Sequence, residues 1–598
     1  MAIARTNERT PQKPPRLWPG VVAVVLQWLV RFGLKIVVPG FSGFLLSVVG
    51  GLLGALAIVL WWAFFSRAPR AERWRAIGLM VVALSATFLA NHESMGPLWL
   101  IAYAIPFLSL AFVAWAVASR HFSDGTRRAT MVGTILVACA VWTTVRTTGI
   151  NGNHVAGFAW RWTESPEEQL LAHAADQPAP LPQADAAATS PAQRLGTRAG
   201  DEPSARPAAP LSTKKEAGWP GFRGPGRDGI IRGVRIATDW TRSPPVELWR
   251  RPIGPGWSSF AVGGGLLYTQ EQRGDEEVVA SYDITTGRPV WTHRDRVRFF
   301  ESNGGAGPRA TPTLTEGRVY AFGATGILNA LDARDGTVVW SRNVASDTSV
   351  EVPVWGFSSS PLAVGDVVIV AAAGQLVAYD RTRGDLRWRG PAGGGGYSSP
   401  HLLTIDGVMQ VVLQSELGTT SVAPATGTLL WEHRWPGVPI VQPALTKDGD
   451  VLITASSGSG TRRIAVAHEP GGWTVKEHWT SVGLKPYFND FVIHEGYAFG
   501  FDGSILACID LEDGKRKWKG GRYGNGQLVL LQDQGVLLVL SEEGELALVV
   551  ATPDQFTELA RFPVLEGKTW NHPVLVGDVL VVRNGQAMVA LRLSPAGQ

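Results

Sequence analysis

The sequence predicts an eight-bladed β-propeller over residues 216–598, preceded by an α-helical membrane domain over residues 1–150. The propeller is predicted by a motif of Asp, three residues, Gly, three residues and Trp that recurs between Asp283 and Trp518. Repetition at a period of roughly 40 to 50 residues is typical of stacked copies of one supersecondary unit. The membrane domain is predicted by a series of long apolar runs in the first quarter of the chain.

Each copy of the motif has a mechanical interpretation. The copies are Asp283-Gly287-Trp291, Asp332-Gly336-Trp340, Asp380-Gly384-Trp388, Ala423-Gly427-Trp431 (with the Asp lost) and Asp510-Gly514-Trp518. We expect the Asp to cap a turn and the Gly to supply a positive φ, so that two strands return on each other. A small residue two positions before the Asp ends the first strand, and we expect the Trp on the outer strand to pack between blades.

A second hairpin precedes each of these, which makes four antiparallel strands per repeat. The clearest copy runs from Ser359-Ser360-Pro361 through the turn Gly365-Asp366. Inner strands are predicted to open near Trp257, Ala310, Ser358, Tyr397, Val441, Asn489, Gln527 and Asn571, which gives eight units.

The last repeat, at Ala590-Leu591-Arg592, is followed by too few residues for a fourth strand, whereas Val246–Trp249 forms a strand with no hairpin of its own. We therefore predict that the first strand completes the last blade. Such a ring leaves no sheet edge open.

The repeat resembles that of the pyrroloquinoline quinone (PQQ) type propellers, and the segment from Trp219 to Gly229 (WPGFRGPGRDG) resembles the leader of bacterial PQQ-like repeat proteins. That superfamily includes quinoprotein dehydrogenases and non-catalytic members that are BamB-like, and BamB belongs to the outer-membrane protein assembly machinery. The resemblance implies a fold and leaves the activity open. Blades of the WD type fit less well because Gly-His and Trp-Asp pairs do not occur in register.

The apolar runs read as about five transmembrane helices. They span residues 20–38, 41–65, 75–90, 97–118 and 129–148. Arg and Lys residues cluster before the first run, between the second and third and between the fourth and fifth, whereas the alternate connections carry none. The positive-inside rule then places the N-terminus in the cytoplasm and the propeller outside it, in the periplasm of a bacterium with two membranes.

Arg31 and Lys35 fall within the second half of the first run. A charge in a membrane helix is costly, so we expect both side chains to reach the outer interface or to face other helices. Whether this run fully spans the membrane stays open at this point.

Residues 151–215 form the predicted connection. Ser165-Pro166-Glu167-Glu168 has the spacing of a capping box with Pro at the first helical position, which predicts a short helix over 166–175. The Pro- and Ala-rich residues that follow predict a flexible linker.

Composition narrows the function classes. A net charge of +4 over 598 residues gives no support for nucleic-acid binding. The two cysteines, Cys139 in a predicted membrane helix and Cys508 on a predicted blade strand, are unsuited to an internal disulfide. The chain also has no Cys-x-x-Cys-His sequence, which excludes a covalently attached c-type haem.

Residues just before the inner strands should converge at the propeller axis. They are Trp257, Arg309, Glu351, Trp355, Tyr397, Gln442, Lys485, Tyr487, Asn489, Asp490, Arg522, Tyr523, Trp570, Asn571 and His572. Any ligand site is expected on this axial face.

PQQ carries carboxylates and a flat quinone, and its binding usually involves a divalent cation. The resemblance implies that Arg309 and Lys485 would meet the carboxylates, that Trp355 or Trp570 would stack, that Glu351, Asn489 and Asp490 would hold Ca²⁺, and that Asp490 or His572 would be the base. Structural roles compete with these assignments, since Asn489 and Asp490 would equally bond loop backbone and Trp355 would equally pack on a neighbouring blade.

Two functions follow from different classes. The favoured one is a membrane-tethered binding or scaffold module for a protein or an envelope polymer. The alternative is a PQQ-dependent dehydrogenase that oxidises an alcohol or sugar and passes electrons to membrane quinone. The layout resembles membrane-bound quinoprotein glucose dehydrogenase, but the short repeats leave little room for the insertions that bury its cofactor.

Overall fold

The structure, a computed structural model, describes residues 16–38, 40–152, 155–172, 218–455 and 458–597. It divides into two compact units. The first contains the residues up to Glu164 together with Glu301–Gly305, and the second contains Ser165–Phe300 and Ala306–Gln598. The predicted Pro-rich linker lies outside the described residues.

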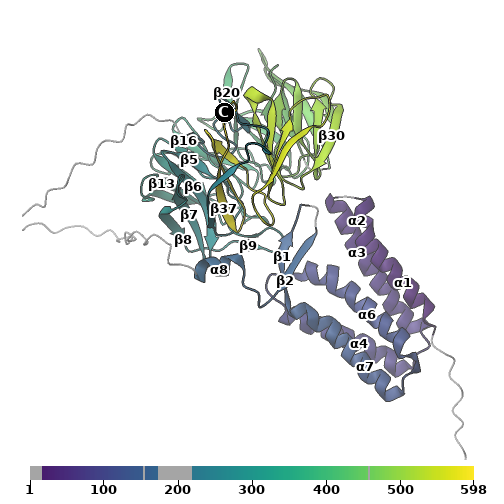
Figure 1. Ribbon diagram of the computed structural model, residues 1–598. Coiled ribbons are helices and arrows are strands. Elements are labelled where there is room, and N and C mark those ends of the chain that lie inside the picture. The colour runs from purple at the N-terminus through teal and green to yellow at the C-terminus, as the bar shows by residue number, and fades with distance from the viewer. Residues whose placement is uncertain (1–15, 39, 153–154, 173–217, 456–457, 598) are drawn as a thin grey trace, which may run out of the picture. The chain divides into compact units, whose positions relative to one another are not determined.

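The first unit is a helical bundle that ends in a hairpin (Figure 1). Its helices are α1 (Trp18–Trp28), the π-helical turn Leu29–Gly33, α2 (Leu34–Val37), α3 (Gly40–Leu60) with the π-helical turn Trp61–Phe65, α4 (Arg70–Ala90), α5 (Pro97–Trp99) with the π-helical turn Leu100–Ala104, α6 (Ile105–Ala118) with the 3-10 turn Ser119–His121, and α7 (Asp124–Ala140) with the 3-10 turn Val141–Thr143. The hairpin pairs β1 (Val145–Ile150) with β2 (Ala156–Trp160).

The prediction of five transmembrane helices is wrong. Among the described residues three helices are long and apolar enough to cross a membrane, namely Gly43–Phe65, Arg70–Ala90 and Pro97–His121. The first predicted run yields only the shorter apolar helix Trp18–Gly33. The fifth fails because α7 includes Arg127 and Arg128 near its start and because its predicted last residues belong to β1.

Arg31 faces other helices, which was one of the two predicted outcomes. Its Nε donates to the carbonyl of Ala102 at 2.8 Å, and its guanidinium carbon lies 4.8 Å from the ring centroid of Tyr103. The side chain is 1% exposed, so the bundle interior rather than lipid solvates this charge. For Lys35 no side-chain position is described.

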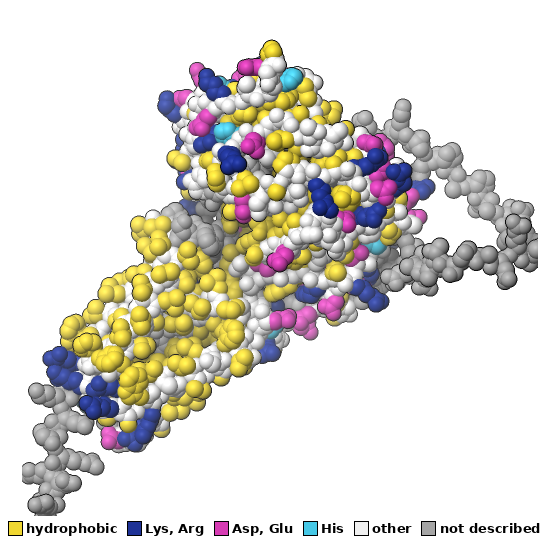
Figure 2. Space-filling model, turned by 180° about the vertical axis from the view of Figure 1, so that it is seen from behind, with side chains coloured by type: hydrophobic (Ala, Val, Ile, Leu, Met, Phe, Trp, Pro, Cys, Tyr) yellow, Lys and Arg dark blue, Asp and Glu magenta, His cyan; other side chains and the backbone are white. Residues whose placement is uncertain are grey.

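On the face that Figure 2 shows, hydrophobic side chains cover most of the bundle, and Lys and Arg side chains gather at one end of it. Inside, Trp62, Phe112 and Trp115 form an aromatic core, with the Trp62 and Phe112 ring centroids 4.8 Å apart. A bundle that is apolar both inside and outside fits a lipid environment and not water.

The second unit is an eight-bladed propeller of four-stranded antiparallel sheets, as predicted (Figure 1). In chain order the blades are β5 (Ala261–Gly263), β6 (Leu266–Arg273), β7 (Glu276–Asp283) and β8 (Pro289–Asp295); β11 (Thr313–Thr315), β12 (Arg318–Phe322), β13 (Ile327–Asp332) and β14 (Val338–Asn343); β15 (Leu362–Val364), β16 (Val367–Ala372), β17 (Gln375–Asp380) and β18 (Leu386–Arg389); and β19 (His401–Ile405), β20 (Val408–Ser415), β21 (Gly418–Val422) and β22 (Leu429–Arg434).

The remaining blades are β23 (Ala444–Leu445), β24 (Val451–Thr454), β25 (Thr461–Glu469) and β26 (Gly472–Ser481); β27 (Val492–His494), β28 (Tyr497–Asp502), β29 (Ile505–Asp510) and β30 (Arg516–Arg522); β31 (Gln527–Leu531), β32 (Val536–Leu540), β33 (Glu545–Val550) and β34 (Glu558–Pro563); and β35 (Val574–Val576), β36 (Val579–Arg583), β37 (Ala587–Arg592) and β4 (Val246–Pro252). We number them blades 1 to 8 in this order. Outside the blades lie β3 (Ile230–Ile231), the pair β9 (Phe300–Glu301) and β10 (Gly305–Ala306), α9 (Val344–Thr348) and the 3-10 turn Gln532–Gln534.

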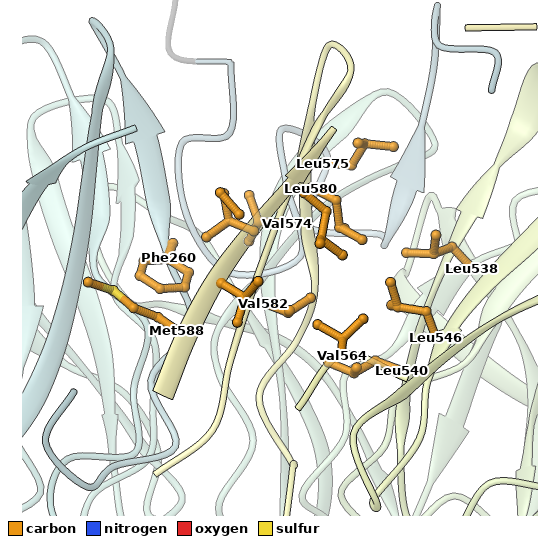
Figure 3. Close-up of a cluster of buried hydrophobic side chains, with 14 of the residues drawn as sticks. Phe260, Leu538, Leu540, Leu546, Val564, Val574, Leu575, Leu580, Val582 and Met588 are labelled. Atoms are coloured by element: carbon orange, nitrogen blue, oxygen red, sulfur yellow. The ribbon is translucent and has the colours of Figure 1, made fainter. Parts of the chain in front are cut away.

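The ring closes as predicted, because β4 is the outer strand of blade 8. Its Trp249 lies opposite Ala590 of β37 in the antiparallel register. At this seam Phe260 and Met588 lie on one side of Val574 and Val582, with Leu538 and Leu546 on the other (Figure 3).

The repeated Trp fixes each blade to the next one, which confirms its predicted role. Trp291 stands opposite the small Ser281 within blade 1, and its indole N–H donates to the carbonyl of Ala333 in blade 2 at 3.0 Å. A Cβ on Gly336 would lie 2.5 Å from the Trp291 ring, so the motif glycine is where the neighbouring indole packs. Trp249, Trp340, Trp388 and Trp518 make equivalent indole bonds to the following blade.

Blade 5 explains the one exception among the motif tryptophans. Its β25–β26 hairpin lacks the motif turn, so Trp431 of blade 4 donates instead to Gln410 Oε1 within its own blade, at 2.6 Å. The predicted Asp caps are present elsewhere, as where Asp283 Oδ1 accepts from the N–H groups of Thr285 and Thr286.

The helix α8 (Pro166–Ala172) belongs to the propeller unit. Its predicted capping box is present, since the Ser165 N–H donates to Glu168 Oε2 and the Glu168 N–H donates to Ser165 Oγ at 3.1 Å. Glu167 also accepts from both terminal nitrogens of Arg298 and from the N–H of Gly274. These contacts anchor α8 on blade 1.

Candidate functional site: the propeller axis

The inner strands β5, β11, β15, β19, β23, β27, β31 and β35 surround the axis and run from one face of the propeller to the other. We call the end where loops enter these strands the loop face; it includes residues 253–257, 482–488 and 564–570. The opposite end, where turns such as 446–449 and 495–496 leave them, is the turn face.

A partial ring of hydrogen bonds joins blades 1 to 6 just above the inner strands. In each step a backbone N–H of one blade donates to a side chain of the next. The chain of donors and acceptors is Ser259 to Thr311, Thr311 to Ser360, Ser360 to Ser399, Ser399 to Gln442 and Gln442 to Asp490, at 2.6–3.0 Å. The Ser-Ser-Pro sequences that open the inner strands therefore serve as blade-to-blade connectors.

The structure brings together Asp490 and His572, the two residues proposed as catalytic. Asp490 Oδ2 lies 3.7 Å from His572 Nε2, and both side chains are buried. Burial, and next the charge of Arg223, lower the pKa of His572 to about 3. Burial raises the pKa of Asp490, against the effects of Arg223 and the Gln442 N–H. A neutral imidazole that is closed off from solvent is well suited to packing and poorly placed to exchange protons with a substrate.

Arg223 and Arg227 of the leader segment (residues 219–229) fill the axis beneath this ring, and our sequence interpretation assigned them no role. Arg223 Nη2 donates to the Phe491 carbonyl at 2.7 Å, and its Nη1 lies 3.6 Å from Asp490 Oδ1. Arg227 donates to the carbonyls of Ser360 and Pro361. The signal was present in the sequence, since two Arg residues stand in a Gly- and Pro-rich segment without apolar periodicity.

Aromatic side chains form a platform on the loop face. Trp570 has its ring centroid 4.7 Å from that of Trp257 and 4.8 Å from that of Phe488, which in turn contacts Tyr487 at 5.1 Å. The Lys568 ammonium lies 4.5 Å from the Trp570 ring centroid, within cation–π range. All five side chains are half-buried, so this aromatic platform is accessible from the loop face.

Most of the other predicted ligand residues already have hydrogen-bond or ion-pair partners within the propeller. Lys485 pairs with Asp502 at 3.0 Å, and Arg309 donates to the Trp355 carbonyl at 3.2 Å. The buried Asn489 accepts from the N–H of Tyr487, whereas Glu351 is exposed. Their role in binding a ligand stays a prediction.

This arrangement does not fit PQQ with Ca²⁺. The expected carboxylate partner Lys485 is held by Asp502, and the expected calcium ligand Asp490 is enclosed between Gln442 and Arg223. Within the described residues, His, Cys, Asp and Glu side chains form no group of three that would hold a metal ion.

Known proteins point to the same superfamily. A family model described as outer membrane protein assembly factor BamB matches residues 246–395 and 350–549. The BamB of Yersinia pestis, an outer membrane protein assembly factor, is 24% identical over 152 residues, which are 24% of this chain and 36% of the relative. The match thus spans about a third of that relative's length.

Two solved structures are similar to this chain at low sequence identity. The crystal structure of BamB from Moraxella catarrhalis is 14% identical, with a TM-score of 0.44 over 58% of this chain and 100% of that one. A quinohemoprotein alcohol dehydrogenase from Comamonas testosteroni is also 14% identical, with a TM-score of 0.46 over 64% of this chain and 81% of that one.

Proposed function

Since this chain belongs to the BamB family of PQQ-like propellers, we propose that it is a membrane-tethered, extracytoplasmic binding module for a protein or an envelope polymer. One observation carries this proposal. The ionisable groups at the axis are enclosed by the hydrogen-bond ring and the leader, whereas the aromatic platform of Trp257, Phe488 and Trp570 is open to the loop face. An open aromatic surface binds a ligand by stacking on it and catalyses no reaction, as is expected of a scaffold.

The extracytoplasmic location is supported by the charge of the bundle ends. Arg67, Arg70, Arg73, Arg120, Arg127 and Arg128 lie in or beside the α3–α4 and α6–α7 connections, and Arg127 pairs with Glu72 of α4 at 3.1 Å. From there α7 runs back along α4 and α6 to Trp142, whose ring packs on Phe107 at 5.4 Å. The chain thus leaves the bundle opposite its basic end, and the positive-inside rule makes that basic end cytoplasmic.

The N-terminal end of α1 lies at the same basic end. The Trp61 indole donates to the Arg16 carbonyl at 2.9 Å, and the Arg16 N–H donates to Ser66 just before Arg67. A cytoplasmic N-terminus follows from the same rule.

The test uses the full chain in detergent with two probes, an unfolded outer-membrane β-barrel protein and soluble peptidoglycan strands. We expect one of them to bind, with affinity lowered at least tenfold by Trp257→Ala and by Trp570→Ala. The control is Trp473→Ala. Trp473 lies on the β25–β26 hairpin away from the axis, with its ring centroid 4.7 Å from that of His468. Failure of both probes would contradict the proposal. Dye reduction after addition of PQQ and Ca²⁺ would support the dehydrogenase instead.

A further inference from the structure

A large cavity opens on the turn face, at the end of the propeller opposite the aromatic platform. Its volume is about 1360 Å³, and the inner strands β19, β23 and β27 line it together with the leader. Its floor includes Arg223 and His401, and its walls carry the half-buried apolar side chains of Leu402, Leu445 and Ile493. A cavity of this size exceeds what a drug-sized ligand needs.

The leader shows how a chain segment binds to this side of the axis. Directly after the leader, β3 pairs in parallel with β31, the inner strand of blade 7, with Ile230 opposite Leu530. Further along the ring, Trp219 bridges to Val262 of β5, and the Leu314 N–H of β11 donates to the carbonyl of Pro220. Backbone hydrogen bonds to inner strands therefore hold the leader on blades 7, 1 and 2.

Among the described residues the leader forms no strand pair with blades 4, 5 and 6, and it reaches blade 6 through the Arg223 side chain, which donates to the Phe491 carbonyl. Within the part of the chain that the structure describes, β19, β23 and β27 are the innermost strands of their sheets, with no strand on their axial side. A sheet edge beside a cavity accepts an added strand, with backbone bonds supplying affinity and side-chain pockets supplying specificity.

The charge of the cavity selects the partner. Among the lining residues, Asp and Glu outnumber Arg and Lys by six to four. Three of the four cations already have carboxylate partners: Arg223 has Asp490, Arg232 has Asp228, and Arg463 has Asp450. Glu495 and Glu512 are exposed at the rim. The negative potential of the cavity favours a bound segment that carries basic residues.

We propose that the cavity binds an extended segment of a partner protein, with alternating apolar and basic residues, which adds as a strand to the inner edge of β19. β19 offers five residues to such a strand, the longest edge of the three. The apolar side chains of the segment would pack against Leu402 and Leu445, and its basic side chains would face Glu495 and Glu512. This site is independent of the aromatic platform.

The test measures fluorescence anisotropy of labelled peptides with the full chain in detergent. The probe is acetyl-Lys-Val-Lys-Val-Lys-Val-Lys-amide, compared with the same peptide N-methylated at alternate residues and with its Glu-Val analogue. N-methylation removes backbone donors and keeps the side chains. We expect at least tenfold weaker binding for the N-methylated peptide and for the acidic one.

Two kinds of variant locate the site. Ala444→Trp fills the cavity and is expected to abolish binding, whereas Ala392→Trp, at an exposed position of the opposite face, should leave it unchanged. The pair Glu495→Lys and Glu512→Lys should invert the preference between basic and acidic peptides, with Glu432→Lys on the outer strand β22 as the control. Equal binding of the N-methylated and unmodified peptides would overturn the proposal. So would a charge preference that the rim substitutions leave unchanged, a readout that stands even if Ala444→Trp does not fold.

Discussion

The Arg223 guanidinium lies 3.6 Å from the Asp490 carboxylate at the propeller axis, and both side chains are buried. Arg223 comes from the leader, whereas Asp490 accepts the last bond of the ring that joins blades 1 to 6. The contact therefore connects the segment that precedes the propeller with the ring that organises it.

Loss of the Arg223 charge is predicted to destabilise the propeller strongly. Arg223→Met would leave Asp490 buried without its partner, which costs about 3–5 kcal/mol for such pairs. The double variant with Asp490→Asn should recover part of that loss, since no uncompensated charge remains. Chemical unfolding of the full chain followed by near-UV circular dichroism measures both. Arg232→Met, which breaks an exposed pair with Asp228, is the control and should cost less than about 1 kcal/mol.

Two turn glycines provide a second test, because the motif glycine Gly336 and the glycine of another blade turn, Gly365, differ in what surrounds them. Gly336 has φ +77° and lies against Trp291, whereas Gly365 has φ +55° and open space around it. Gly365→Ala should cost about 1 kcal/mol for the left-handed backbone alone. Gly336→Ala adds the displaced indole and should cost roughly 1–3 kcal/mol more. Equal unfolding midpoints for the two variants would show that the Trp–Gly contact does not hold the blades together.

The propeller could be predicted because its signals are local. The turn at Asp332 and Gly336 needs a cap and a positive φ, and these needs are met by neighbours in sequence. Ring closure could be predicted because the repeat at Ala590 has no outer strand of its own, whereas the strand at Trp249 has no hairpin of its own. Both are statements about periodicity that a sequence carries directly.

The axis could not be predicted to the same depth, because its contacts join residues far apart in the chain. Residues before the inner strands do converge at the axis. The pairing of their side chains, however, depends on the tilt of the blades and on the position of the leader. Asp490 is enclosed by Gln442 and Arg223, and Arg223 lies 267 positions before it in sequence. The prediction of the fifth membrane span failed for another reason, since apolar content alone did not show that the residues after Thr144 pair as a hairpin.

Glu277 is predicted to make stability depend on pH. Burial raises the pKa of Glu277 to about 7, although Thr325 and the Ala324 N–H bond its carboxylate. A raised pKa in the folded state means that the unfolded chain releases this proton first as pH rises. Stability should therefore fall between about pH 4.5 and pH 7, by up to roughly 3 kcal/mol.

The variant Glu277→Gln isolates this effect. Its advantage over the unmodified chain should grow from pH 5 to pH 8 in thermal melts, because the amide carries no charge to bury. Glu276→Gln, at the neighbouring and partly exposed position on the same strand, serves as the matched control. A constant difference across that range would exclude Glu277 as the source.

Arg583 is predicted to hold the seam where the ring closes. From blade 8 it donates to Thr269 Oγ1 at 2.8 Å and to the carbonyls of Gln270 and Gly254 at 2.9 Å, beside the buried Glu271. Arg583→Met leaves these acceptors unpaired and removes a cation from Glu271, so we expect a loss of about 3–5 kcal/mol. Arg583→Lys keeps the charge but lacks the planar fork of N–H donors, so its loss of stability should lie between that of Arg583→Met and that of the unmodified chain. Unfolding midpoints of Arg583→Met and Arg583→Lys are compared with that of Arg592→Met, the control at an exposed position of the same blade. If Arg583→Met unfolds at the same midpoint as Arg592→Met, then the strand pairing of β37 with β4 closes the ring unaided.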